Sequence, residues 1–403
     1  MKKLLYMVSI ILIIVGCGGG GGGTKENAKI ELTTDAKAVA YSTKDVSWNP
    51  KSDKVEDLGN GFKKYTIYED GNYKVALNCN KILFIFALNS SSNSSLYFKC
   101  PAILSFYSNL NGSIKDSVDN AQNFAVAAYT DYAILQNNSN PNFSLNVKNG
   151  KTDLIGVTFS SSIVPKRFYI KRDITTPALS SQNIVISATN SVLVKKGGNF
   201  SGANSEDRLI LITKNDTYFT SSILNNGWYY PDGALSSDDI FLNYSYDSNK
   251  KVFKTVMVEA TNIEKKDINN IALPTAKLSG ITYANGAINN LKYTPSSDSL
   301  EFKAYLLDIR GNPTYKKIIR VAISKEYLKT QNSSSFKIEN LTAIDGFSDV
   351  YDGSNVVSIE ATAMMSNSKL YDIFKSQRYL NLSTCKMFLL KDATIEYASF
   401  KVK

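Results

Sequence analysis

The chain has 403 residues, of which 43% are hydrophobic and 20% are charged, and its formal net charge is +10. Histidine is absent from the whole sequence, which excludes Ser-His-Asp and Cys-His catalysis within this chain and metal sites with histidine ligands. The basic residues are spread thinly, without a block of five or six like charges, which favours an ordinary solvated surface over attraction to lipid headgroups or acidic glycans.

Residues 1–16 have the features of a secretory signal peptide. Lys2 and Lys3 supply positive charge, and residues 4–15 form an apolar run in which only Ser9 is polar. A helix needs about 20 apolar residues to span a bilayer, so this run is too short. Its length and flanks instead fit the apolar region of a signal peptide.

The sequence Ile-Val-Gly-Cys at 14–17 resembles the lipobox of bacterial lipoproteins. The resemblance implies cleavage before Cys17, which would then carry acyl chains as a membrane anchor. Two or more chains hold a protein stably on a membrane, whereas one is marginal. Lipoproteins retained in the inner membrane often carry Asp after the cysteine; Gly18 stands there in this chain, which by resemblance favours the outer membrane.

Residues 17–30 are expected to form a lipidated, flexible tether. Six glycines occupy 18–23, and a polar stretch follows them. Glycine samples positive φ freely, and the segment could reach about 45 Å when fully extended. A folded body on this tether would stand clear of the lipid headgroups, and we expect it to be displayed on the cell surface, where nucleic acid is not an expected partner.

The body is expected to begin with a β-rich domain at 31–165 that holds two of the three remaining cysteines. Cys79 and Cys100 are a natural disulfide pair in an exported protein. A hairpin between 82–88 and 96–98 would, however, place Cys79 opposite Ser105. The bridge therefore requires a bulge, or strands that pair elsewhere. Residues 118–135 are compatible with either a helix or strands.

A second domain, a β-sandwich, is expected at 166–325. Asn-Gly and Asp-Gly dipeptides, which favour type I′ hairpin turns, recur along the whole body. Residues 239–246 and 251–259 predict two strands around a turn, and 300–309 with 314–323 repeat the plan. Short strands at this spacing predict antiparallel sandwiches or barrels. The chain is therefore expected to be all-β, with two or three sandwich domains and one or two short helices.

The third domain, β-rich, is expected at 326–403, after a polar stretch at 325–335. Residues 366–379 are the better helix candidate, because Leu370, Ile373 and Phe374 have helical spacing. Cys385 is expected to be a buried, inert thiol.

Two segments of the body resemble known bacterial surface modules. Residues 300–324, LEFKAYLLDIRGNPTYKKIIRVAIS, look like strands of bacterial immunoglobulin-like repeats joined by an Asp-x-x-Gly-Asn-Pro turn. The heptapeptide VPKRFYI at 164–170 is similar to a strand that precedes such modules in pilus-associated proteins of the MSHA type. These resemblances imply an Ig-like sandwich and supply no catalytic residue.

The most suggestive stretch for ligand binding is 225–233. Trp228, Tyr229 and Tyr230 lie between turn dipeptides and could stack on sugar rings or anchor a protein partner. The alternative, which the usual burial of Trp favours, is that Trp228 fills a core.

Two acidic groups complete the candidate sites. Asp345, Asp349 and Asp352 could offer oxygen ligands to calcium, although two Asp-Gly turns explain them as well. Asp232, Asp238 and Asp239 could include a glycosidase pair, if two of them lay about 5 Å or 7–9 Å apart. We expect neither a metal site nor a cofactor.

The sequence therefore predicts a lipid-anchored surface protein that binds a protein or glycan ligand and is not an enzyme. One alternative is a periplasm-facing assembly factor for an envelope machine such as a pilus. Another is a carboxylate-based hydrolase, which requires acidic side chains that converge in a cleft.

Overall fold

The computed structural model describes residues 28–44, 47–49, 54–100, 107–129, 131–135, 141–160, 164–176, 181–199, 208–220, 227–247, 252–265, 273, 275, 277–294, 300–311, 317–376, 378–381, 386–389 and 394–403. The expected signal peptide, the expected lipidation site Cys17 and Cys385 lie outside the described residues.

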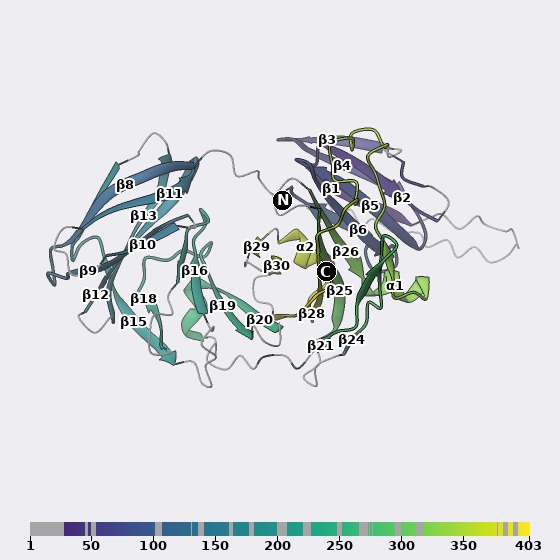
Figure 1. Cartoon of the computed structure of the whole chain (residues 1–403). Helices are drawn as coiled ribbons and strands as arrows, with labels where there is room; N and C mark the ends of the chain where they lie inside the picture. The colour runs from purple at the N-terminus through teal and green to yellow at the C-terminus, as the bar shows by residue number, and fades with distance from the viewer. Residues whose placement is uncertain are drawn as a thin grey trace, which may run out of the picture.

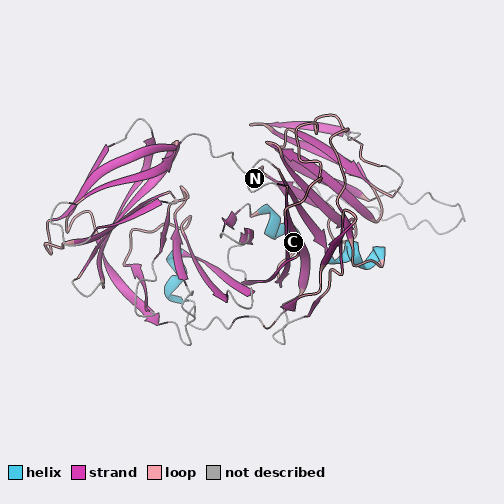
Figure 2. Cartoon of the chain, viewed as in Figure 1, coloured by secondary structure: helices cyan, strands magenta, loops and turns pink. Residues whose placement is uncertain are grey.

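The protein is all-β, as the turn dipeptides and short strand patterns predict (Figure 2). In the described part of the chain, helical structure is confined to α1 (Lys325–Gln331), α2 (Leu370–Lys375) and the 3-10 helix η1 (Ala260–Lys265).

An eleven-stranded sheet, here called the central sheet, runs through both sides of the molecule (Figure 1). Every neighbouring pair is antiparallel except β26 and β6, which are parallel. In sheet order the strands are β17 (Tyr218–Thr220), β16 (Arg208–Ile212), β19 (Ile240–Asp247), β20 (Val252–Glu259), β31 (Thr394–Lys401), β28 (Ser358–Ser366), β25 (Phe302–Arg310), β26 (Ile318–Ser324), β6 (Ile82–Asn89), β5 (Asn72–Cys79) and β2 (Ala38–Ser42).

A four-stranded sheet, here called the N-terminal sheet, packs on one face of the central sheet. Its strands are β3 (Lys54–Gly59), β4 (Phe62–Tyr68), β1 (Lys29–Thr34) and β7 (Ser95–Phe98). Ile30 and Leu32 alternate with polar residues along β1 and are fully buried in the shared core. Phe374 of α2 enters the same core, with its ring centroid 5.4 Å from that of Phe86.

Short strands and turns cover the opposite face of the central sheet. The strands are β21 (Lys277–Leu278), β22 (Thr282–Ala284), β23 (Ala287–Asn289), β24 (Tyr293–Thr294) and β27 (Phe336–Lys337). Their buried Ile288 and Phe336 share a core with Ile309 and Ile359 of the central sheet. Strand β6 has the nearly unbroken apolar sequence ILFIFALN, because a strand covered on both faces needs apolar residues on both.

The blue and teal strands of Figure 1 form a body of three stacked β layers. The layers are an outer sheet, a middle sheet, and the strands β17, β16, β19 and β20 of the central sheet. The middle sheet contains β10 (Asp131–Leu135), β9 (Asn123–Ala128), β12 (Gly150–Phe159), β13 (Pro165–Thr176), β15 (Val192–Asn199) and β18 (Gly227–Pro231). The outer sheet contains β11 (Asn142–Lys148), β8 (Tyr107–Asp116) and β14 (Ser181–Ile186). Apart from this body, β29 (Arg378–Asn381) and β30 (Lys386–Leu389) form a small two-stranded sheet that follows α2 in the sequence.

Strand β16 shows how alternation assigns side chains to these layers. Leu209 and Leu211 point into the core shared with the middle sheet. Ile210 and Ile212 contact the core shared with the N-terminal sheet. One strand thus contributes to two cores, because successive side chains lie on opposite faces of a sheet.

Of the segments considered for helices, one contains the expected helix, one resolves an open choice, and a third helix lies where a polar stretch was expected. Residues 366–379 contain α2, which buries Leu370, Ile373 and Phe374. The segment 118–135, which suited either a helix or strands, contains the paired strands β9 and β10. Strand β9 is buried on both faces between two sheets. The polar stretch at 325–335 contains α1, whose N-cap Ser324 accepts a hydrogen bond from the Tyr327 amide.

Strand pairing crosses both of the expected domain boundaries. The boundary at 165/166 falls within β13, which pairs with β12 of the preceding segment. Across the boundary at 325/326, β20 pairs with β31 and β25 pairs with β28. Strand β26 of the second expected domain pairs with β6 of the first. The strands of the segments 31–165, 166–325 and 326–403 are therefore interleaved in shared sheets, because backbone hydrogen bonding joins strands that are far apart in the sequence.

Candidate functional site

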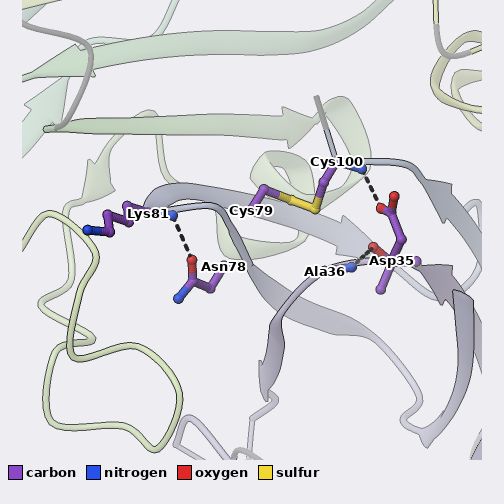
Figure 3. The surroundings of a disulfide bond; sticks show 7 residues. Asp35, Ala36, Asn78, Cys79, Lys81 and Cys100 are labelled. Atoms are coloured by element: carbon purple, nitrogen blue, oxygen red, sulfur yellow. Dashed lines mark hydrogen bonds between the residues drawn. A yellow bond between two sulfur atoms is a disulfide. The ribbon is translucent and has the colours of Figure 1, made fainter. Parts of the chain in front are cut away.

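A disulfide joins Cys79, the last residue of β5, to Cys100, which follows β7 (Figure 3). It connects the central sheet to the N-terminal sheet, and both cysteines are buried. The Cys100 amide donates a hydrogen bond to Asp35 Oδ1 over 2.6 Å (Figure 3). A simple hairpin of β6 with β7 would have placed Cys79 opposite Ser105. That hairpin does not form, because β7 pairs in parallel with β1 and β6 pairs with β5 and β26.

The aromatic triplet lies on β18, at the edge of the middle sheet. Trp228 is only 3% exposed and belongs to the core between the middle and central sheets. Its ring lies against the backbone of Gly197, where a Cβ atom would come within 1.9 Å of the ring. Tyr229 and Tyr230 are half-buried. The triplet is thus divided between one core residue and two residues that reach the surface.

Tyr229 and Tyr230 line an apolar pocket at the edge of this sandwich. The middle sheet contributes Val157, Pro165, Phe168 and Val194, and β18 adds Pro231. The central sheet contributes Leu211, Phe219 and Phe241. The empty volume is about 290 Å³, including solvent at the open mouth. Because the edge strands β18 and β17 both contribute to this pocket between the two sheets, we call it the sandwich pocket.

Charged groups surround the Tyr230 hydroxyl beside the sandwich pocket. Burial raises the pKa of Tyr230, and its hydrogen bond with Glu264 raises it further. Lys195 Nζ lies 2.8 Å from Asp232 Oδ1 and 3.6 Å from Glu264 Oε1. The hydrogen bond with Asp232 raises the pKa of Lys195. The sandwich pocket therefore has an apolar lining and a charged edge beside Tyr230.

The acidic residues Asp232, Asp238 and Asp239 have three different surroundings. Asp232 binds Lys195, Asp238 is exposed, and Asp239 is fully buried against Arg172. A carboxylate held by an arginine is stabilised in its charged form and is a poor general acid. These residues give the hydrolase alternative no support.

A buried ion cluster, which the sequence interpretation missed, surrounds Arg172 of β13. Its guanidinium donates to both carboxylate oxygens of Asp239 over 2.8 and 2.5 Å, and to Asp153 Oδ2 over 3.0 Å. Both aspartates have no exposed surface. Asp153 also accepts a hydrogen bond from Asn215, and Asp239 accepts one from the Lys214 amide. The cluster ties the middle sheet to loops of the central sheet.

Opposing effects set the pKa of Asp239. Burial acts to raise it, but the hydrogen bond from Arg172 and the one from the Ser236 amide outweigh burial, so the pKa is lowered. The sequence did carry a signal for the cluster: Asp153 interrupts the apolar strand GKTDLIGVTF, and a buried carboxylate requires a partner.

The acidic loop at 345–353 also separates into local contacts. Asp349 Oδ2 accepts from Lys37 Nζ over 2.9 Å, and Asp349 Oδ1 accepts from Asn78. Asp352 accepts from the amide and hydroxyl of Ser354 within its own turn. Asp345 is exposed. Within the described residues, no group of three acidic or cysteine side chains is arranged to hold a metal ion.

Comparisons with known proteins leave the family open. No protein-family model matches the chain, and the search of curated proteins found no match. Among the described residues, no helix has the length and apolar character to cross a membrane.

Proposed function

We propose that this protein is a lipid-anchored protein of the bacterial outer membrane whose β-sheet body is displayed on the cell surface and binds a partner. The observation that supports it most is the Cys79–Cys100 disulfide. Such bridges persist in oxidising compartments outside the cytosol. This agrees with the signal-peptide pattern and the lipobox cysteine Cys17.

A binding role, and not catalysis, is favoured by the side chains available. The chain has no histidine, and the acidic candidates Asp232, Asp239 and Asp349 are engaged in ion pairs. The sandwich pocket instead presents partly exposed tyrosines. Tyrosine supplies a large contact area with little loss of conformational freedom, which suits a binding surface.

Protease treatment of intact cells tests the display. A protease too large to cross the outer membrane should digest the body in intact cells, while a soluble periplasmic protein in the same cells stays whole. Digestion only after lysis would contradict surface display and support the periplasmic assembly-factor alternative.

Metabolic labelling with radioactive palmitate tests the anchor. Cys17→Ala should abolish labelling and release the protein from the membrane fraction. Cys385→Ala is the matched control and should keep both. Label that survives Cys17→Ala would refute the lipobox assignment.

Binding itself can be measured with the purified protein on immobilised glycans and matrix proteins. Tyr229→Ala should weaken capture by any ligand that engages the sandwich pocket. Tyr68→Ala is the matched control, because Tyr68 is 41% exposed on β4 of a different sheet. Equal loss in both variants would show that the pocket is not the contact.

A further inference from the structure

The body of three stacked layers, here called the three-layer body, comes from one continuous stretch of the chain. Its strands run from β8 to β20, residues 107–259, and η1 follows them. The other described strands, β1–β7 and β21–β31, build what we call the proximal body, because the expected tether at 17–30 leads into β1. The three-layer body is therefore an insertion in the proximal body, and the chain first crosses into it after Cys100 (Figure 1).

Strand pairing also links the two bodies. Strand β20 pairs with β31 along residues 252–256 and 394–398. Within this seam Lys254 Nζ lies 2.9 Å from Glu396 Oε1, and the Glu396 side chain is only 3% exposed. A partner that pulled on the three-layer body would therefore load this seam together with the chain segment after Cys100.

The Cys79–Cys100 bridge lies where the chain leaves the proximal body (Figure 3). Cys100 follows β7, the edge strand of the N-terminal sheet, which pairs with β1. Without the bridge, a pull on Cys100 would load the pairing of β7 with β1. The bridge instead passes the pull to Cys79 at the end of β5, which lies between β6 and β2 in the central sheet.

We propose that the Cys79–Cys100 bridge is a mechanical clamp, which keeps residues 80–99 out of the path of tension between the membrane tether and a partner held by the three-layer body. A covalent bridge carries the load from one cysteine to the other, so the loop between them cannot be extended while the bridge is intact. This inference rests on the anchored binding role proposed above, because that role supplies the tension.

The protected loop contains strands at the centre of the proximal body. Strand β6 pairs with β5 on one side and with β26 on the other, and it is buried along nearly its whole length. Leu96 and Phe98 of β7 fill the core between the N-terminal and central sheets. Extraction of this loop would open that core and break the central sheet between β5 and β26.

The length of the loop sets the size of the expected effect. The two cysteines are 21 positions apart, and an extended chain gains at most about 3.3–3.6 Å per residue. Reduction of the bridge should therefore lengthen the first opening of the proximal body by about 70 Å. It should also lower the force of that opening, because the pairing of β7 with β1 then carries the load instead of β5 within the central sheet.

Optical tweezers on the purified full chain in detergent test the clamp. DNA handles attach to p-azidophenylalanine placed at Thr24, in the expected tether, and at Lys115, which is exposed on β8. The parent is pulled before and after complete reduction, which thiol counting verifies. Reduction should lengthen the first opening by about 70 Å and lower its force. Joint replacement of Cys79 and Cys100 by Ala should match the reduced parent, and if that variant does not fold, the reduced parent decides.

A second pair of attachment points provides the matched control. Handles at Lys115 and Leu193 pull within the three-layer body, since Leu193 is 58% exposed on β15. The chain between these two points does not contain the bridge, so reduction should leave the force and the extension unchanged. A change of the same size in this control would show that reduction weakens the protein elsewhere, and would overturn the assignment to the clamp.

A first opening of equal length and force in both redox states would overturn the inference, because residues 80–99 would then bear no load with or without the bridge. That result would leave the proposed surface display intact, since protease digestion of intact cells and palmitate labelling measure it independently. A body that is protected in intact cells would, by contrast, contradict the display and leave the redox-dependent length of the opening unaffected.

Discussion

Removal of the Arg172 side-chain charge tests whether the buried ion cluster holds two sheets together. Arg172→Met keeps an unbranched apolar stem but removes the guanidinium, which leaves Asp153 and Asp239 without their cation. Both carboxylates have no exposed surface, so water cannot replace the guanidinium without a rearrangement. The Arg172 side chain is 23% exposed, which gives water a route to part of the cluster.

The expected loss in the free energy of unfolding follows from this geometry. Removing one partner of a buried ion pair costs about 3–5 kcal/mol. We expect about 3 kcal/mol, at the lower end, because backbone amides and Asn215 still donate to the aspartates. Urea unfolding followed by tryptophan fluorescence measures the change, since Trp228 lies in the adjacent core.

Arg167→Met provides the matched control. Arg167 also lies on β13, but its partner Asp119 is 31% exposed, and Nε lies 3.0 Å from Asp119 Oδ2. A partly exposed pair contributes about 1 kcal/mol or less. A loss below about 1 kcal/mol in Arg172→Met, or equal losses in the two variants, would refute the reasoning.

The pH dependence of the same variant gives a second readout. The folded protein lowers the pKa of Asp239 below its ordinary value. Its stabilising contribution is therefore present above the unfolded pKa, about 3.9, and disappears as the pH falls through the lower folded value. The difference in stability between the parent and Arg172→Met should narrow below about pH 4. A difference that grows with acid would contradict the assignment.

Three further perturbations follow from the described contacts. Joint replacement of Cys79 and Cys100 by Ala should lower stability by about 3 kcal/mol, because the bridge spans 21 positions of chain; a parent protein whose unfolding midpoint is unchanged by a reductant would contradict this. Gly197→Ala should lower the thermal midpoint, since the new Cβ would lie 1.9 Å from the Trp228 ring and overpacking typically costs about 1–3 kcal/mol. Gly59→Ala is the comparison: Gly59 has φ +79° and no atom within 4 Å of the Cβ position, so its loss measures backbone strain without a clash, and an equal loss in Gly197→Ala would contradict the packing argument. Asn285→Val should weaken the β22–β23 hairpin by about 1 kcal/mol in hydrogen exchange, because Asn285 has φ +52°, which a β-branched residue disfavours; Asn289→Val, on the strand itself, should not.

The local elements of this protein were largely determined by its sequence. Asn60-Gly61 and Asn285-Gly286 have positive φ at both positions and join neighbouring strands, as type I′ turns require. The helical spacing of the apolar residues in α2 and the pairing of Cys79 with Cys100 were also predictable. These features depend on nearby residues, or on there being few cysteines to pair.

The assembly of the strands was decided only by the tertiary structure. Asn111-Gly112 has the sequence of a turn, yet it lies within β8, where a Cβ on Gly112 would meet the carbonyl of Gln182 at 1.8 Å. The parallel partner strand β14 imposes that requirement. Likewise, Asp153 has its partner Arg172 on the next strand, while Asp239 comes from a distant loop.

The sandwich pocket has the same origin. Its lining comes from seven strands of two sheets. Only the tyrosines on β18 belonged to a recognisable sequence signal, the aromatic triplet. Alternating apolar residues specify that a strand buries one face, but not which other sheet covers it. The sequence therefore determined the β class and its turns, whereas long-range pairing determined the interleaved sheets, the buried ion cluster and the pocket.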